Sequence, residues 1–169
     1  MEGRAPVADM IPSKLKQAVL LASASGAAAI AAVLIQWHEG IRYVPYADPG
    51  NGTLTVCYGH TGPDIIPGKR YTLAECQALL AKDQAKAEAA VDRLVTVPID
   101  KYQKAALIDF AYNKGSGNLA TSTLLRLTNA GQEATACQQY HRWVKGGGRV
   151  LPGLVNRADA DAWVCEGAK

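Results

Sequence analysis

Residues 37–62 read WHEGIRYVPYADPGNGTLTVCYGHTG, and this stretch decides how the rest of the chain is interpreted. Glu39 stands at the end of an apolar run that is typical of a helix. Residues 42–47 predict a first strand, residues 48–52 (DPGNG) predict a turn, and residues 53–58 predict a second strand. The stretch therefore predicts a helix that leads into a β-hairpin.

Two acidic side chains flank this hairpin. Glu39 precedes it, and Asp48 opens its turn, while Thr53 and Thr55 lie on the polar strand behind the turn. A pair of carboxyl groups placed in this way suits glycoside hydrolysis, in which one acid protonates the glycosidic oxygen and the other activates water. Taken singly, each has a simpler interpretation, because a solvated Glu at a helix end and an Asp at the start of a turn are both common.

The composition restricts the classes of function. The chain has 169 residues, of which 49% are hydrophobic and 20% charged, with a net charge of +3. This length allows one domain with a sizeable core and an appendage. The mild charge and the lack of a dense Lys/Arg cluster argue against a nucleic-acid partner, and they suit an anionic polymer such as cell wall.

Four cysteines occur, at Cys57, Cys76, Cys137 and Cys165. They form no CxxC pair, and no histidines are spaced as metal ligands, so we expect no metal site and no cofactor. An even number in a small domain predicts two disulfides in an oxidising compartment. Of the three possible pairings we favour the sequential one, which closes a local loop in each half. Four free thiols in a cytosolic protein are the alternative.

Residues 18–35 (AVLLASASGAAAIAAVLI) carry no charge. This uncharged stretch has just the minimum length for a membrane-spanning helix. Only seven of them are large aliphatic residues, worth about −2 to −4 kcal/mol on an insertion scale, so we expect marginal insertion. Lys14 and Lys16 precede the segment and predict that the N-terminus stays in the cytoplasm. Two alternatives are a signal peptide cleaved near residues 22–24 and a buried Ala-rich core helix.

The remainder of the chain reads as helical. Thr72 and Glu75 form a capping box that opens a helix running to about Val95. Further helices are predicted over residues 100–113, 121–129, 132–144 and 154–164, and the sequence KGSG at 114–117 and the glycines 146–148 read as loops. A small hairpin-containing lobe followed by helices indicates the α+β class. We expect an N-terminal tail and anchor helix over residues 1–35 and a catalytic domain over residues 36–169.

These residues resemble the phage-type lysozymes, glycoside hydrolase family 24. The family pattern is Glu, eight residues, Asp, about five residues and Thr, followed shortly by Gly-His. Glu39 and Asp48 match it, and Gly59-His60 matches its end. Six residues separate Asp48 from Thr55, one more than is usual, which leaves Thr53 as a rival to Thr55. The resemblance continues through residues 110–117, 122–125 and 153–157, and so covers nearly all of 36–165.

The resemblance implies a role for each matching residue. Glu39 would be the general acid, Asp48 the base, and Thr55 would hold the attacking water, with inversion at the anomeric carbon. Arg157 matches the arginine that pairs with the catalytic Glu. The other positions implied are cleft-lining Asn113 and Asn156 and a structural ion pair of His60 with Asp83. Simpler interpretations are a solvent-facing Arg, capping Asn residues and an ordinary strand Thr.

The resemblance also implies a function and a location. The expected protein is a monomeric signal-anchor-release endolysin that cleaves the β-1,4 bond between N-acetylmuramic acid and N-acetylglucosamine in peptidoglycan. It would be tethered inactive in the inner membrane of a Gram-negative host and then released to the periplasm. Residues 1–35 contain no Cys, so the freed helix would refold onto the domain without disulfide exchange. Alternatives are a lytic transglycosylase, a chitinase-like enzyme and an inactive membrane-anchored wall-binding protein.

Overall fold

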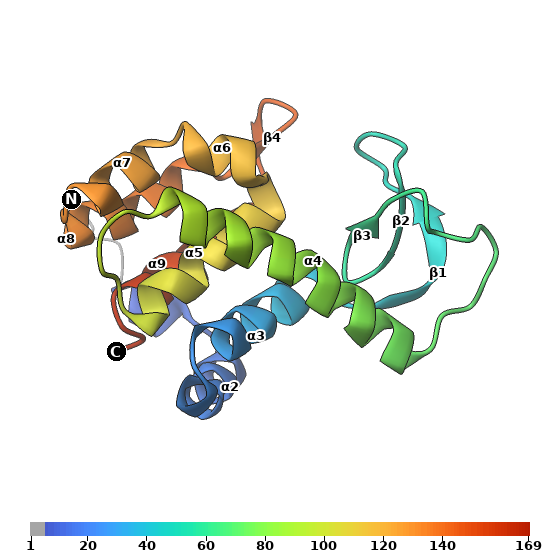
Figure 1. Cartoon of the computed structure of the whole chain (residues 1–169), viewed down its shortest axis with the longest axis horizontal. Coiled ribbons are helices and arrows are strands. Elements are labelled where there is room, and N and C mark those ends of the chain that lie inside the picture. The colour runs from blue at the N-terminus through green and yellow to red at the C-terminus, as the bar shows by residue number, and fades with distance from the viewer. Residues whose placement is uncertain (1–5) are drawn as a thin grey trace.

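Helices form most of the molecule, and a small antiparallel sheet stands at one end of it (Figure 1). The computed structural model describes residues 6–169, and residues 1–5 of the expected tail lie outside the described part. The helices are α1 (Val7–Met10), α2 (Ser13–Ala22), η1 (Ser23–Ser25), α3 (Ala27–Glu39), α4 (Leu73–Leu94), α5 (Lys101–Lys114), α6 (Ser116–Ala120), α7 (Thr123–Asn129), α8 (Glu133–Cys137), η2 (Gln138–Arg142) and α9 (Pro152–Cys165). The strands are β1 (Arg42–Ala47), β2 (Leu54–Cys57), β3 (His60–Thr61), β4 (Lys145–Gly146) and β5 (Arg149–Val150). The α+β class, with a sheet lobe and a helical lobe, is confirmed.

The apolar segment 18–35 is divided between two helices. α2 ends at Ala22, the short 3-10 helix η1 follows, and Gly26 adopts a φ of +91° before α3 begins. This backbone conformation is open to glycine and costly for other residues. The boundary expected between residues 35 and 36 falls inside α3, which runs on to Glu39. Within residues 6–169, every helix is too short or too polar to reach across a membrane.

Both halves of this segment pack onto the helical lobe. Val19 on α2 and Ile30 and Leu34 on α3 are fully buried in the same hydrophobic core as residues of α5 and α9. Nε2 of Gln84, on α4, donates a hydrogen bond of 2.7 Å to the carbonyl oxygen of Ala28. The N-terminal helices are therefore part of the folded domain in this structure.

The central element of the helical lobe is α5, which packs against α3, α4, α6 and α9. Asp100 caps α5 and Thr72 caps α4, and each cap closes a capping box with the residue three positions further on. Every residue from 105 to 111 is buried, and this run includes the acidic Asp109.

The sheet is a three-stranded antiparallel unit in the order β1-β2-β3. The backbone N–H of Gly52 donates to the carbonyl oxygen of Asp48 over 2.7 Å, which closes the predicted turn between β1 and β2. In this register Thr55 pairs with Tyr46 on one side and with Thr61 on the other. Thr55 is therefore the central residue of the sheet, next to the turn that carries Asp48.

Two disulfides tie the lobes internally. Cys57 at the end of β2 is bonded to Cys76 in the first turn of α4. Cys137 at the end of α8 is bonded to Cys165 at the end of α9. This is the sequential pairing, and each bond joins two elements of one lobe.

Two parts of the helical lobe differ from the prediction. Residues 116–120 form α6, although the glycines on either side of Ser116 predicted a loop. The helix expected over residues 132–144 is replaced by α8 and the 3-10 helix η2. Gly147 and Gly148, with φ of +56° and +78°, form the turn between β4 and β5.

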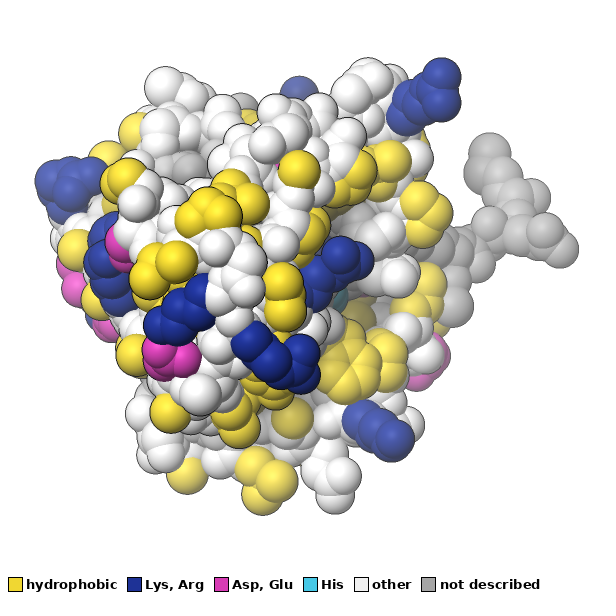
Figure 2. All heavy atoms as spheres, turned by 90° about the vertical axis from the view of Figure 1, so that its right-hand side faces the viewer, with side chains coloured by type: hydrophobic (Ala, Val, Ile, Leu, Met, Phe, Trp, Pro, Cys, Tyr) yellow, Lys and Arg dark blue, Asp and Glu magenta, His cyan; other side chains and the backbone are white. Residues whose placement is uncertain are grey.

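The face of the molecule at the sheet end carries basic side chains among hydrophobic ones (Figure 2). The guanidinium carbon of Arg42 lies 4.3 Å from the ring centroid of Tyr46, and Nζ of Lys69 lies 4.6 Å from that of Tyr71. Such cation–π contacts are worth about 0.5–1 kcal/mol at exposed sites. The first contact orients Tyr46 at the edge of the groove described below.

Candidate active site

Glu39 is the last residue of α3, and its carboxylate is held by Arg157 of α9. Nη1 of Arg157 donates to Oε1 of Glu39 over 2.6 Å. The side chain of Glu39 remains 24% exposed, whereas that of Arg157 is buried. The expected contact between the two side chains is therefore present, and it orients a carboxylate that a ligand can still reach.

Arg157 is held in turn by Asp109 of α5. Nε of Arg157 donates to Oδ2 of Asp109 and Nη2 donates to Oδ1, each over 2.8 Å. Burial alone would raise the pKa of Asp109, but the adjacent Arg157 charge outweighs this and holds the pKa below its usual value. Burial likewise opposes the charge of Arg157, and the carboxylates of Asp109 and Glu39 raise its pKa. The guanidinium is thus fixed by a bidentate ion pair on one side and directed at Glu39 on the other.

Glu39 and Asp48 line the same groove, which has a volume of about 290 Å³. Glu39 reaches it from the end of α3, and Asp48 reaches it from the β1–β2 turn. Oδ1 of Asp48 accepts hydrogen bonds from the backbone N–H groups of Gly50 (2.8 Å) and Asn51 (3.3 Å). These bonds fix the carboxylate in the turn. The other residues that line the groove are Tyr46, Asn51, Thr53, Thr55, Gly59 and Thr61.

Both candidate threonines lie in this groove. Thr55 is buried, at 5% exposed, and its hydroxyl donates a 3.1 Å hydrogen bond to the carbonyl oxygen of Thr53. Because its proton is used in this way, the hydroxyl oxygen of Thr55 faces the groove as an acceptor. The side chain of Thr53 is exposed.

Gly59 allows Glu39 to come close to the sheet. Its φ is +80°, and a Cβ placed on it would lie 3.0 Å from Oε2 of Glu39. Any larger residue would be strained in its backbone and would push against the carboxylate. The sequence indicates Gly59 only as part of the Gly-His motif, and the close approach of Glu39 is the physical reason for a glycine at this position.

The groove continues beyond Gly59 into a second hollow of about 260 Å³ between the sheet and the helices. Gly59 and Thr61 line both hollows. The second one is also lined by Asp83, Lys86, Ala87, Ala111, Tyr112 and Ser116. Together they form an extended polar cleft, which is the shape needed to bind a chain of sugars.

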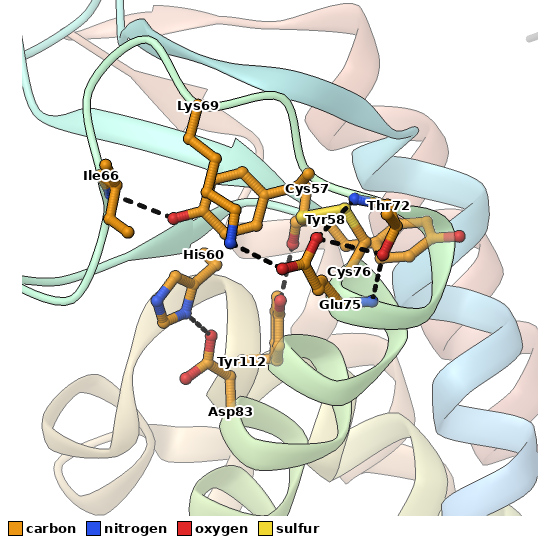
Figure 3. Close-up of a disulfide and its surroundings, with 11 residues drawn as sticks. Cys57, Tyr58, His60, Ile66, Lys69, Thr72, Glu75, Cys76, Asp83 and Tyr112 are labelled. Carbon is orange, nitrogen blue, oxygen red and sulfur yellow. Dashed lines mark hydrogen bonds and ion pairs between the residues drawn. A yellow bond between two sulfur atoms is a disulfide. The ribbon is translucent and has the colours of Figure 1, made fainter.

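His60 and Asp83 lie in contact beside this cleft, close to the Cys57–Cys76 disulfide (Figure 3). Nδ1 of His60 is 2.5 Å from Oδ2 of Asp83, and Nε2 of His60 is 3.0 Å from Oδ1 of Asp64. The Lys82 and His60 hydrogen bonds hold the pKa of Asp64 below its usual value. Because these contacts join β3 to α4, we interpret them as structural.

The two asparagines occupy other places. Asn113, half-buried on α5, lines a small internal cavity next to Arg157. Asn156 is exposed on α9, one residue before Arg157. Neither is among the residues that line the groove of Glu39 and Asp48.

Residues 36–161 match the protein family described as phage lysozyme. The chain belongs to the phage lysozyme family. This lysozyme is 46% identical over 157 residues to the SAR-endolysin of Bacteriophage PS119, and the match covers 89% of this chain and 93% of the relative. It is 45% identical over 157 residues to the SAR-endolysin of Bacteriophage PS34, with the same shares covered.

The fold of the lysozyme is shared with solved structures. The muramidase domain of SpmX from Asticaccaulis excentricus superposes with a TM-score of 0.73 and is 30% identical, covering 79% of this chain and 92% of that chain. The predicted family, the lysozyme-like fold and the assignment as a glycoside hydrolase are confirmed. The protein is a phage endolysin with muramidase activity, and its family acts on peptidoglycan.

Several residues of this lysozyme site were not predicted. Asp109 was given no role within the helix predicted over residues 100–113, and Tyr46 was interpreted only as part of a strand. A signal for Asp109 was present, because a carboxylate inside a buried run is costly unless a cation is paired with it. For Tyr46, which lies between Pro45 and Ala47 in the predicted strand, the sequence held no comparable signal.

Proposed function

We propose that this endolysin hydrolyses the β-1,4 bond between N-acetylmuramic acid and N-acetylglucosamine, with Glu39 as general acid and Asp48 as general base. The observation that carries the proposal is that both carboxyl groups line one groove. They come from different elements, and each is held by its own hydrogen bonds. A glycosidase needs this arrangement of two separately positioned acids.

Each side chain has a step in the reaction. Glu39 gives its proton to the glycosidic oxygen as the bond to the anomeric carbon breaks. Asp48 takes a proton from the water that attacks this carbon from the opposite face, which inverts its configuration. Thr55 accepts a hydrogen bond from that water. Arg157 then stabilises the carboxylate that Glu39 becomes, through the charge-assisted hydrogen bond already present.

The resemblance to the inverting lysozymes sets an expected distance between the two acids. In inverting glycosidases the carboxyl groups are about 6.5–9.5 Å apart, which leaves room for the water. In retaining enzymes they are about 5–5.5 Å apart, because one of them attacks the sugar directly. We propose the inverting arrangement, with water in the groove between Glu39 and Asp48.

The same chain would be controlled by its N-terminal segment. We propose that residues 18–35 first span the host inner membrane, with the N-terminus inside and the domain outside, and are then released into the periplasm. While they span the membrane, Ile30 and Leu34 cannot fill the core of the helical lobe. Glu39, which follows on the same helix, cannot then reach Arg157. After release, the monomer would pack α2 and α3 onto the helical lobe as described above, and this would complete the active site.

Product analysis tests the proposed reaction. Purified peptidoglycan treated with the soluble protein should yield products with a reducing N-acetylmuramic acid end of inverted configuration. A lytic transglycosylase would instead produce anhydro sugars and would not need Asp48. Asp48→Asn should therefore lower the rate by roughly 100-fold or more, the usual contribution of a general base. Anhydro products, or full activity of Asp48→Asn, would contradict the proposal.

A further inference from the structure

A second buried acid lies behind the Arg157–Asp109 pair. Asp161 is on α9, one helical turn beyond Arg157, so the two side chains share a face of the helix. Asp161 is 3% exposed. Its Oδ1 has no hydrogen-bond partner among the described residues, and its carboxyl group lies within hydrogen-bonding reach of that of Asp109.

A hydrogen bond between two carboxyl groups requires a proton on one of them, because an ionised carboxylate only accepts. Both oxygens of Asp109 already accept from Arg157. Asp109 is therefore the ionised partner, and the proton between the two acids belongs to Asp161.

The charges around Asp161 agree with this assignment. The groups that face it are Asp109 and the half-buried Lys114 on α5, Arg157 on its own helix, and Tyr140 on η2. The hydrogen bonds of Arg157 go to Asp109 and Glu39. No ion pair within residues 6–169 joins Asp161 to Arg157 or to Lys114, so a third negative charge there would be buried without a paired cation, which is strongly unfavourable.

The far side of Asp161 is also suited to a neutral acid. The hydroxyl of Tyr140 is buried without a hydrogen-bond partner in the described chain, as is Oδ1 of Asp161. Both residues line a cavity of about 10 Å³, which is close to the space that one water molecule needs.

We propose that Asp161 is a positioning residue that stays protonated and donates a hydrogen bond to ionised Asp109, so that Asp109 holds Arg157 in the orientation that serves Glu39. The proposal rests on the role of Glu39 given above. Asp161 touches neither the groove nor the substrate, and it acts through Asp109 and Arg157. Burial and the neighbouring Asp109 raise the pKa of Asp161 well above its usual value, in agreement with a neutral acid at pH 7.

Two variants of Asp161 separate positioning from general stability. Asp161→Leu removes the donor and keeps the same branching and number of side-chain heavy atoms, so kcat should fall roughly 10- to 100-fold, as expected when a catalytic group is misplaced. KM and the urea midpoint should stay close to those of wild type. Asp161→Asn keeps a donor to Asp109 and should restore most of the lost kcat. Thr128→Val is the matched control, because it removes a buried polar group on α7, away from the groove.

Infrared difference spectroscopy tests the proton itself. Wild type minus Asp161→Asn at pH 7 should show the carbonyl stretch of a protonated carboxyl group. The absence of this band would overturn the proposal, and so would full activity of Asp161→Leu or equal impairment of Asp161→Asn and Asp161→Leu. Failure of Glu39 as the acid would leave the band in place, so the two proposals can fail separately.

Discussion

Arg157 on α9 binds Glu39 at the end of α3 over 2.6 Å, although 118 residues of sequence separate them. The same guanidinium is bound by Asp109, which is fully buried. The reactive end of α3 is therefore aligned by the helical lobe, and the site is complete only when α3, α5 and α9 are packed together.

Removing Arg157 should destabilise the protein as well as inactivate it. Arg157→Met leaves Asp109 buried without a counter-charge, which costs about 3–5 kcal/mol when one partner of such a pair is lost. Urea unfolding at pH 7 measures this loss. The double variant Arg157→Met, Asp109→Asn should recover a large part of the stability but not the activity. A loss below about 1 kcal/mol in the single variant would match a surface ion pair and contradict the account.

Gly59→Ala should affect activity more than stability. The added methyl group would lie 3.0 Å from Oε2 of Glu39 and displace it, so we expect roughly 10- to 100-fold slower wall clearing. Gly131→Ala is the matched control, because Gly131 also has a positive φ (+69°) but nothing within 4 Å of the added group. Both variants should lose about 1–2 kcal/mol from backbone strain. Equal clearing rates for the two variants would show that Gly59 does not position Glu39.

Stability should fall as the pH drops below 6.5 because of His38. Burial lowers its pKa from 6.5 to about 4, against the attraction of Asp109. Below pH 6.5 the unfolded chain therefore takes up a proton that folded His38 binds only near pH 4, and this favours unfolding. Between pH 7 and pH 5 the loss should be roughly 2 kcal/mol in wild type and absent from His38→Gln in urea unfolding. The same slope in both proteins would exclude His38 as the cause.

A stronger anchor should keep the enzyme tethered and inactive. Ala24, Ser25 and Ala28 are exposed in the folded protein, so leucines there do not disturb the core. Together they should strengthen insertion by roughly 1–2 kcal/mol. Cell fractionation should find this triple variant in the membrane, whereas a control with leucines at 81, 85 and 89, exposed on α4, should be released normally. Normal release of both would contradict marginal insertion.

Local features of the sequence predicted much of this fold. The capping box at Thr72 and the turn at residues 48–52 involve residues only a few positions apart, so the sequence shows all the interacting groups at once. Local features could not predict that Glu39 and Asp48 share a groove, because the distance between them depends on how the hairpin packs on α3. The resemblance to the phage-type lysozymes led to this prediction instead.

Tertiary packing determined the features that were missed. For segment 18–35 the sequence allowed an anchor that refolds onto the domain or a buried core helix, but it indicated neither the break that Gly26 allows nor the core that receives Ile30. Asp109 lies in an apolar run, and its role was not recognised because its partner Arg157 is 48 residues away in the sequence. In both cases the deciding contact is long-range, so the local sequence does not identify the partner.

The account depends most on Glu39 as the acid, and the clearing rate of purified peptidoglycan by Glu39→Gln tests this directly. Gln has nearly the same shape but no acidic proton, so the rate should fall roughly 100-fold or more while the urea midpoint changes little. Glu133→Gln, an exposed position on α8, serves as the control and should clear like wild type. Clearing by Glu39→Gln at the rate of Glu133→Gln would contradict the central claim.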